Sequence, residues 1–137
     1  MIVTESKLVA KVPGLSLTVE VRAVALWESG RESQKVKGVE FTPHGRGEFP
    51  SIRVDLEDVA EIAKACKMLQ ELSEKWKDEV ALGAEYHHRS GLSLSIDRLG
   101  DNGPLTAFLF FYGAIVQLPV ASLPLIAQAL DDVPRFY

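Results

Sequence analysis

The sequence predicts an α+β fold in which an antiparallel β-sheet, made of a meander and a second hairpin, is packed by one long central helix and a short C-terminal helix. Apolar and polar residues alternate in steps of two before residue 55 and again after residue 90, which is typical of strands with one buried face. Over residues 59–76 apolar residues recur at steps of three and four, the period of an amphipathic helix. A chain of 137 residues with 47% apolar and 25% charged residues fits one domain over residues 1–137.

The meander comes first. Pro13-Gly14 suits a tight turn between its first two strands, because proline presets one backbone angle and glycine accepts a positive φ at the next. Charged residues and Gly30 break the chain before the third strand. The predicted strands cover residues 7–12, 15–27, 35–41 and 51–56.

The long helix follows the fourth strand directly. Asp55 is the expected N-cap, and Glu57 and Asp58 add negative charge at the positive end of the helix dipole. Cys66 lies on the apolar stripe and is expected as a small core residue, because burial in apolar surroundings leaves a thiol inert. The stripe consists of Val59, Ile62, Cys66, Leu69, Leu72 and Trp76.

The second half gives a hairpin of residues 91–100 and 105–113, with turn residues at 101–104. Residues 114–119 can add one more strand, and residues 81–90 form either a loop or an edge strand. Ser122 and Pro124 mark the start of the C-terminal helix, residues 122–133.

One strand of this hairpin is apolar on both faces. A two-residue turn at Asn102-Gly103 places Phe108, Phe110 and Tyr112 on the same face as the small polar residues of the partner strand, whereas a five-residue loop places Leu109 and Phe111 there. Pro104 has no N–H with which to close the tight turn, so both registers stay open. In either register a bulky apolar row needs a cover, which is the second helix, another subunit or stacked bases.

Composition excludes several classes of function. No apolar run approaches the length that spans a bilayer, and the N-terminus lacks the order of a secretion signal, so we expect a cytoplasmic protein with no membrane contact. Cys66 is the only cysteine and cannot form an internal disulfide or a thiolate metal cage. The net charge of -4 argues against a surface coated with positive charge for duplex binding.

No catalytic or cofactor motif is present, so we expect a protein that is not an enzyme and holds no cofactor or metal. His87 and His88 are adjacent, and in a strand they point to opposite faces, so they could not bind one ion together. The glycines at 38, 45 and 47 lack the lysine and the serine or threonine that complete a phosphate loop.

The segment from residue 31 to residue 53 mixes cations and aromatic rings, as nucleic-acid strands require, because cations follow phosphates while rings stack on bases. Four glutamates are interleaved, so a basic patch forms only if folding separates the signs, and otherwise the segment is a solvated hairpin. Together with Tyr112 of the aromatic row, the candidate nucleic-acid contacts are Lys35, Lys37, Phe41, His44, Arg46, Phe49, Arg53 and Tyr112.

The element order resembles a known family, with FTPHGRGEFPSIRV (residues 41–54) entering the long helix and FLFFYGAIVQLP (residues 108–119) entering the last one. It is similar to the ThermoDBP-related proteins of hyperthermophilic archaea. That resemblance implies a thermophilic archaeal protein that binds single-stranded DNA in a cleft with an apolar floor and basic edges, and that forms homo-oligomers. The unit of four strands and an amphipathic helix also looks like the Whirly-type single-stranded DNA binders.

Two hypotheses of different classes result. In the first, the protein binds single-stranded DNA or RNA as a homo-oligomer, with Lys37, Arg46 and Arg53 on phosphates and Phe41, Phe49 or Tyr112 on bases. In the second, it is a non-catalytic assembly or protein-interaction module whose apolar row is a subunit interface.

Overall fold

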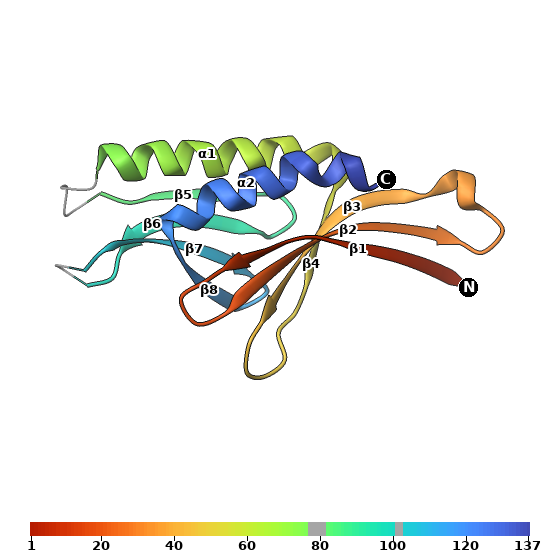
Figure 1. Ribbon diagram of the computed structural model, residues 1–137, viewed down its shortest axis with the longest axis horizontal. Helices are drawn as coiled ribbons and strands as arrows, with labels where there is room; N and C mark the ends of the chain where they lie inside the picture. The colour runs from red at the N-terminus through yellow and green to blue at the C-terminus, as the bar shows by residue number, and fades with distance from the viewer. Residues whose placement is uncertain (77–81, 101–102) are drawn as a thin grey trace.

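The computed structural model describes residues 1–76, 82–100 and 103–137, and these residues form two four-stranded antiparallel sheets, each followed by a helix (Figure 1). Sheet 1 contains β1 (Ile2–Pro13), β2 (Thr18–Glu28), β3 (Val36–His44) and β4 (Ile52–Asp55), and leads into α1 (Val59–Lys75). Sheet 2 contains β5 (Ala84–His87), β6 (Ser93–Arg98), β7 (Leu105–Phe111) and β8 (Ala114–Pro119), and leads into α2 (Leu123–Asp132). The predicted α+β class is confirmed.

Residues 84–87 and 114–119 both form strands of the second sheet. β5 pairs with β6, and β8 pairs with β7, so the predicted second hairpin becomes the centre of a complete meander. Each sheet keeps the order of its strands in the sequence. The chain therefore uses one unit, four strands followed by a helix, twice.

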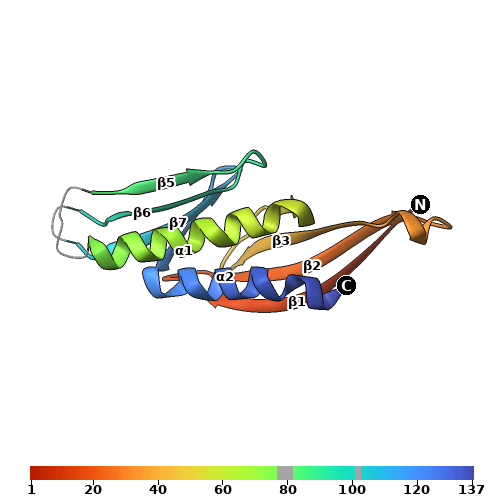
Figure 2. The same ribbon diagram turned by 90° about the horizontal axis from the view of Figure 1, so that it is seen from above.

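Both helices lie on one side of the two sheets (Figures 1 and 2). α1 follows sheet 1 in the chain but packs against β6, whereas α2 follows sheet 2 and packs against β1 and β2. The two helices also pack against each other, and buried apolar side chains from both sheets and both helices form one core. We call the sheet faces turned away from the helices the outer faces; neither α1 nor α2 covers them.

The apolar stripe of α1 is buried as predicted, including Cys66. Burial raises the pKa of the Cys66 thiol to about 12, which keeps it protonated and inert. The predicted cap differs: Asp55 precedes a short 3-10 turn (Leu56–Asp58), and neither Asp55 nor Asp58 makes a side-chain capping bond. Neither described helix combines the length and apolar character that a bilayer crossing requires.

The first hairpin joins the two sheets. Its strands end at Pro13 and Thr18, so its connection is longer than the predicted tight turn. The Leu15 N–H donates to the Gln117 carbonyl oxygen at 2.9 Å, which places the hairpin tip against β8. Gly14 permits both this approach and the turn itself, because a Cβ at that position would lie 3.0 Å from the Gln117 carbonyl oxygen and 2.2 Å from that of Leu17.

The register of β6 and β7 places the aromatic row on the outer face of sheet 2. Phe110 pairs with Ser93 and Phe108 with Ser95, so these rings share the face of the serines. This is the face that a two-residue turn predicts, but the pairing is shifted by two residues, since Asp97 lies opposite Thr106 rather than Phe108. Asp101 and Asn102 of the predicted turn lie outside the described residues.

Candidate nucleic-acid interface

A groove lies on the outer face of sheet 2. Its volume is about 440 Å³, and it is open to solvent along the sheet. Phe110 and Ile115 are 41% and 59% exposed, which is unusual for large apolar side chains on a sheet. The lining residues are Glu85, His87, Ser93, Leu94, Ser95, Asp97, Phe108, Phe110 and Ile115.

The strand period explains why β7 carries aromatic rings on this face. Ala107, Leu109 and Phe111 point toward the helices and are buried, so Phe108 and Phe110 must point the other way. Opposite them stand Ser93 and Ser95, whose side chains are small. A row of large rings beside a row of small side chains leaves a hollow in the surface, and the groove occupies it.

Tyr112 is a further exposed aromatic residue, at the turn between β7 and β8. Its φ of 49° lies in the left-handed region, where a bulky side chain is strained, and Gly113 follows with a φ of 80°. The side chain is nevertheless 65% exposed. It contacts Phe111 edge to face, with ring centroids 6.3 Å apart. The turn thus presents a large exposed ring where asparagine or glycine would be easier to accommodate.

The charges that line the groove are acidic. Glu85 and Asp97 lie on its rim, and the described lining residues include no lysine or arginine. His87 bridges two groove residues: its Nδ1 is 2.8 Å from the Ser93 hydroxyl oxygen, and its Nε2 is 3.1 Å from a carboxylate oxygen of Glu85. The groove therefore offers aromatic faces and hydrogen-bond acceptors, but no counter-charge for a phosphate inside it.

The outer face of sheet 1 is charged, and most of its charges pair with one another. Arg53 donates to Glu40 at 2.9 Å across the β3–β4 pair. Glu20 lies between two partners, with Arg22 at 2.9 Å and His44 at 3.1 Å. Folding therefore does not separate the signs on this face, and Arg53 and His44 reach solvent already paired with carboxylates.

Lys35 and Lys37 lie near the end of sheet 1 that extends beyond the helices (Figure 2). The Lys35 ammonium lies 4.3 Å from the ring centroid of Trp27, and that of Lys37 lies 5.4 Å from the ring of Tyr137. Both distances suit cation–π contacts. The Tyr137 hydroxyl donates to the carbonyl oxygens of Val24 and Gly38, which fixes the C-terminal ring on the sheet.

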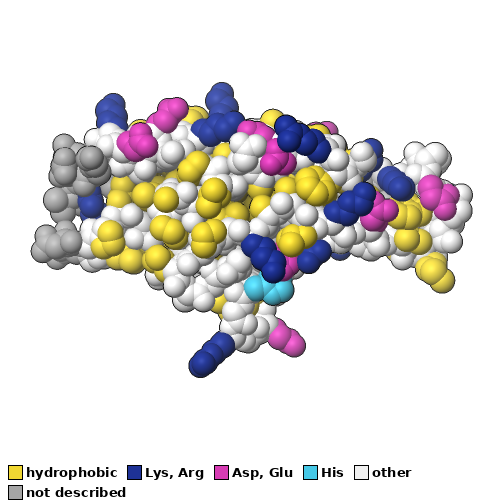
Figure 3. Space-filling view, in the orientation of Figure 1, with side chains coloured by type: hydrophobic (Ala, Val, Ile, Leu, Met, Phe, Trp, Pro, Cys, Tyr) yellow, Lys and Arg dark blue, Asp and Glu magenta, His cyan; other side chains and the backbone are white. Residues whose placement is uncertain are grey.

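Arg46 and Phe49 belong to the loop between β3 and β4, which projects from the side opposite the helices (Figure 1). Arg46 is exposed and makes no ion pair within the described part of the chain, and Phe49 is half-buried. Gly47 takes a φ of 95°, so it serves the turn itself. Basic and acidic side chains stand close together at the tip of this loop and again along the upper edge and the right half of the view, whereas the left centre is mostly hydrophobic and uncharged (Figure 3).

The expectation for Phe41 does not hold. Its side chain is 1% exposed, because it shares the helix-facing side of β3 with Val39, and it belongs to the core.

The remaining candidates fall into separate groups. Lys35 and Lys37 lie at the start of β3, His44 lies at its end, Arg46 and Phe49 lie in the loop that follows, and Arg53 lies on β4 opposite Glu40. Tyr112 lies in the turn between β7 and β8.

Several groove residues carry no strong signal in the sequence. Ile115 alternates with buried Val116 and Leu118, which is the pattern that could identify an outward-facing side chain on β8. Glu85 and His87 lie on a strand of four residues, too short for a clear alternation. Trp27, which holds Lys35, lies at a strand end where the period fades.

Comparison with models of known protein families, with curated proteins and with solved structures finds no match.

Proposed function

We propose that this protein binds single-stranded nucleic acid and stacks unpaired bases on the outer face of sheet 2. The observation that carries the proposal is the row of Phe108 and Phe110, with exposed Tyr112 in the adjoining turn, on a sheet face that neither α1 nor α2 covers. Every base has a π-face, so exposed rings beside a groove form a platform that tolerates any sequence. The small side chains of Ser93 and Ser95 leave room for a flat base against those rings.

The acidic rim determines how a strand would lie. Phosphates avoid Glu85 and Asp97, so the backbone runs along the outside while the bases enter the groove. Carboxylate and hydroxyl oxygens accept hydrogen bonds from the exocyclic amino groups of bases. Arg46, on the loop that projects from the same side of the molecule, is the cation best placed for a phosphate, because no described carboxylate pairs with it.

A second candidate function uses the same surface. The described groove residues include two carboxylates and no cation, and exposed Phe110 and Ile115 also suit contact with another subunit. In this case the protein is an assembly module, and a second copy covers the outer face of sheet 2. The two functions differ in a simple respect: one requires the face to be free in solution, and the other requires it to be covered.

Fluorescence anisotropy with labelled single-stranded DNA, single-stranded RNA and duplex, each over a salt series, tests the proposal. We expect single strands to bind at least tenfold more tightly than duplex, because paired bases cannot stack on the protein. Phe110→Ala should weaken single-strand affinity about tenfold, since base–aromatic stacking contributes roughly 1–3 kcal/mol per base. Leu125→Ala, which removes a similarly exposed side chain from α2, is the matched control and should leave affinity unchanged.

Analytical ultracentrifugation of the same proteins separates the two functions. An oligomer that Phe110→Ala converts to monomer, together with no affinity for any single strand, would replace the binding function with the assembly function. A monomer that binds single strands and loses that affinity with Phe110→Ala supports the proposal.

A further inference from the structure

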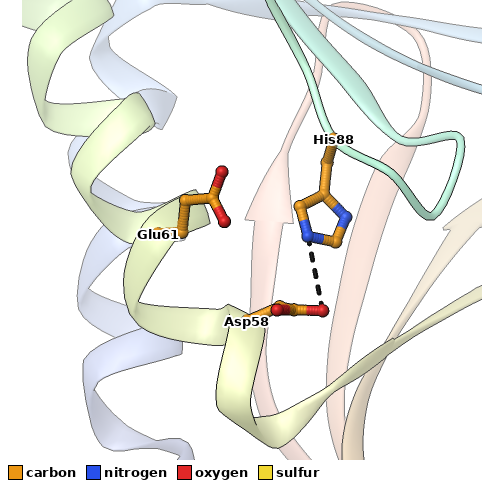
Figure 4. A group of neighbouring side chains, drawn as sticks. All are labelled: Asp58, Glu61 and His88. Atoms are coloured by element: carbon orange, nitrogen blue, oxygen red, sulfur yellow. Dashed lines mark ion pairs between the residues drawn. The ribbon is translucent and has the colours of Figure 1, made fainter.

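One histidine and two carboxylates gather where α1 begins (Figure 4). Asp58 directly precedes α1, Glu61 lies in its first turn, and His88 lies just after β5. A ligand atom of each side chain lies within 4.8 Å of the other two. His87, the neighbour of His88, lines the groove on the outer face, so the cluster is separate from that groove.

His88 is the residue that points to a ligand. Its side chain is 2% exposed, and its Nδ1 lies 2.7 Å from the Ser90 hydroxyl oxygen. Its Nε2 is buried without a hydrogen-bond partner among the described residues. This atom is aimed at Asp58, whose Oδ2 lies 3.5 Å away, beyond the usual length of a hydrogen bond (Figure 4). Buried polar atoms are nearly always satisfied, so this nitrogen requires an explanation.

Asp58 is turned toward His88 and away from the helix that it precedes. An aspartate at an N-cap normally accepts a hydrogen bond from a backbone N–H of the first turn, but Asp58 makes no such bond. Its two carboxylate oxygens instead accept N–H groups of Arg89 at 2.9 to 3.2 Å. The side chain is largely buried, so its orientation is set by these neighbours.

Glu61 completes the cluster from the solvent side. The Tyr86 hydroxyl donates to its Oε1 at 2.8 Å, which holds the carboxylate near the cluster. The residue is exposed, so a cation from solution can reach the site past it. As an exposed glutamate it also has the freedom to close on a bound ion.

We propose that His88 Nε2 and the carboxylates of Asp58 and Glu61 bind a divalent transition-metal cation of the Zn²⁺ type. One imidazole nitrogen with two carboxylates suits Zn²⁺, whereas Mg²⁺ and Ca²⁺ prefer oxygen ligands throughout. Ligands at the usual zinc distances of about 2.0–2.2 Å in a tetrahedron lie about 3.4 Å apart. The separation of 3.5 Å between Nε2 and Oδ2 already matches that edge. Glu61 supplies the third ligand by a small side-chain movement.

Ser90 contacts the other ring nitrogen of His88, Nδ1, through both its hydroxyl and its backbone N–H. When a metal binds Nε2, the proton of the ring stays on Nδ1 and needs an acceptor, as second-shell groups of metal-bound histidines usually provide. The Ser90 hydroxyl oxygen, 2.7 Å from Nδ1, can accept it, but the Ser90 backbone N–H, which donates to the same nitrogen at 3.1 Å, must then turn away. Arg89 competes with the metal cation, because its positively charged guanidinium already donates hydrogen bonds to the Asp58 carboxylate. Glu57, 3.3 Å from the same guanidinium, offers that group another partner.

Isothermal titration calorimetry of the untagged full chain with Zn²⁺, supported by Co²⁺ absorption spectroscopy, tests the site. We expect one Zn²⁺ per chain, with Mg²⁺ and Ca²⁺ failing to compete. Glu61→Gln, an exposed change that should not disturb folding, should weaken Zn²⁺ affinity at least tenfold, and His88→Gln should do the same. Arg89→Gln should strengthen affinity severalfold, because it removes the competing positive charge.

His87→Gln and Glu71→Gln are the matched controls, since they make the same chemical changes outside the cluster, and both should leave the affinity for Zn²⁺ unchanged. If Zn²⁺ does not bind with a stoichiometry of one, then Nε2 carries a proton directed at Asp58 and the proposal fails. It also fails if Glu61→Gln and folded His88→Gln bind as tightly as the parent chain. Circular dichroism establishes folding, and if His88→Gln is unfolded, Glu61→Gln alone decides.

Discussion

The outer faces of the two sheets have the same architecture and opposite chemistry. On sheet 1 the side chains are charged and pair with one another, as Arg53 does with Glu40 and His44 with Glu20. On sheet 2 the face carries Phe108 and Phe110 beside serines, and nothing in the described chain covers it. One structural unit is thus used twice, and the chemistry of the exposed side chains, rather than the fold, distinguishes the two faces.

The charge pattern of the sequence favours the segment from residue 31 to residue 53 as the binding surface, whereas the structure favours the outer face of sheet 2. The segment from residue 31 to residue 53 has the most cations, but its partners lie close by and neutralise several of them. The outer face of sheet 2 has few charged residues around its aromatic row. Exposed aromatic side chains on a sheet are less common in folded proteins than paired surface charges. The comparison therefore favours sheet 2 over sheet 1 as the surface for the proposed base contacts.

The largest expected effect is the loss of the aromatic row. Phe108→Ala combined with Phe110→Ala should lower affinity for single-stranded nucleic acid about a hundredfold, because each stacked base contributes roughly 1–3 kcal/mol. Anisotropy titration measures the affinity, and circular dichroism establishes that the half-buried Phe108 can be removed without unfolding. If the double variant binds single strands within threefold of the affinity of the parent, the aromatic face of sheet 2 is not the binding surface.

A smaller and more informative effect is expected at Tyr112. Tyr112→Asn should raise the free energy of unfolding by about 1 kcal/mol, since the left-handed conformation costs a non-glycine residue roughly 1–2 kcal/mol and asparagine tolerates it. The same change should weaken single-strand affinity about fivefold, because the exposed ring is lost. Urea denaturation and anisotropy measure the two quantities on the same protein.

Tyr112→Phe is the control for this experiment, because it keeps the ring and the strained backbone and should change neither quantity. Opposite signs for stability and affinity in Tyr112→Asn would indicate that the turn retains a costly residue for contact with a ligand. A variant that is less stable than the parent would mean that Tyr112 is held by packing, with no strain to release.

Arg46 is expected to contribute modestly. Arg46→Ala should weaken single-strand affinity about threefold and reduce the slope of log affinity against log salt by about 0.7, the value for one phosphate contact on a single strand. Arg135→Ala, which removes an exposed cation from the short helix after α2, is the matched control. A slope equal to that of the parent would place Arg46 outside the phosphate path.

Period-two alternation divided the side chains of β7 into two rows, but it left open which row faces the core, because both registers of the hairpin were compatible with the sequence. The same rule, applied to Val39 and Phe41 on β3, also indicates that Phe41 is buried, so that error came from weighing residue type above position. The pairing of Arg53 with Glu40 depends on strand register, which turn length decides and local sequence does not reveal. The approach of His88 to Asp58, which are thirty residues apart, depends on how α1 packs on sheet 2. No local pattern contains that information.

The smallest expected effect is the one that can overturn the comparison. Arg53→Ala should change single-strand affinity less than twofold, because its guanidinium already donates to Glu40, and exposed ion pairs contribute only about 0–1 kcal/mol to stability. Glu40→Gln provides the complementary variant: it frees Arg53 without removing it. One pair of results would contradict the comparison: Glu40→Gln raises affinity, and Arg53→Ala lowers it more than Arg46→Ala does. Phosphates would then contact sheet 1, and the glutamates would weaken that contact by pairing with its cations. If neither variant changes affinity, the Arg53–Glu40 pair has no part in binding, which favours sheet 2 as the surface that holds the strand.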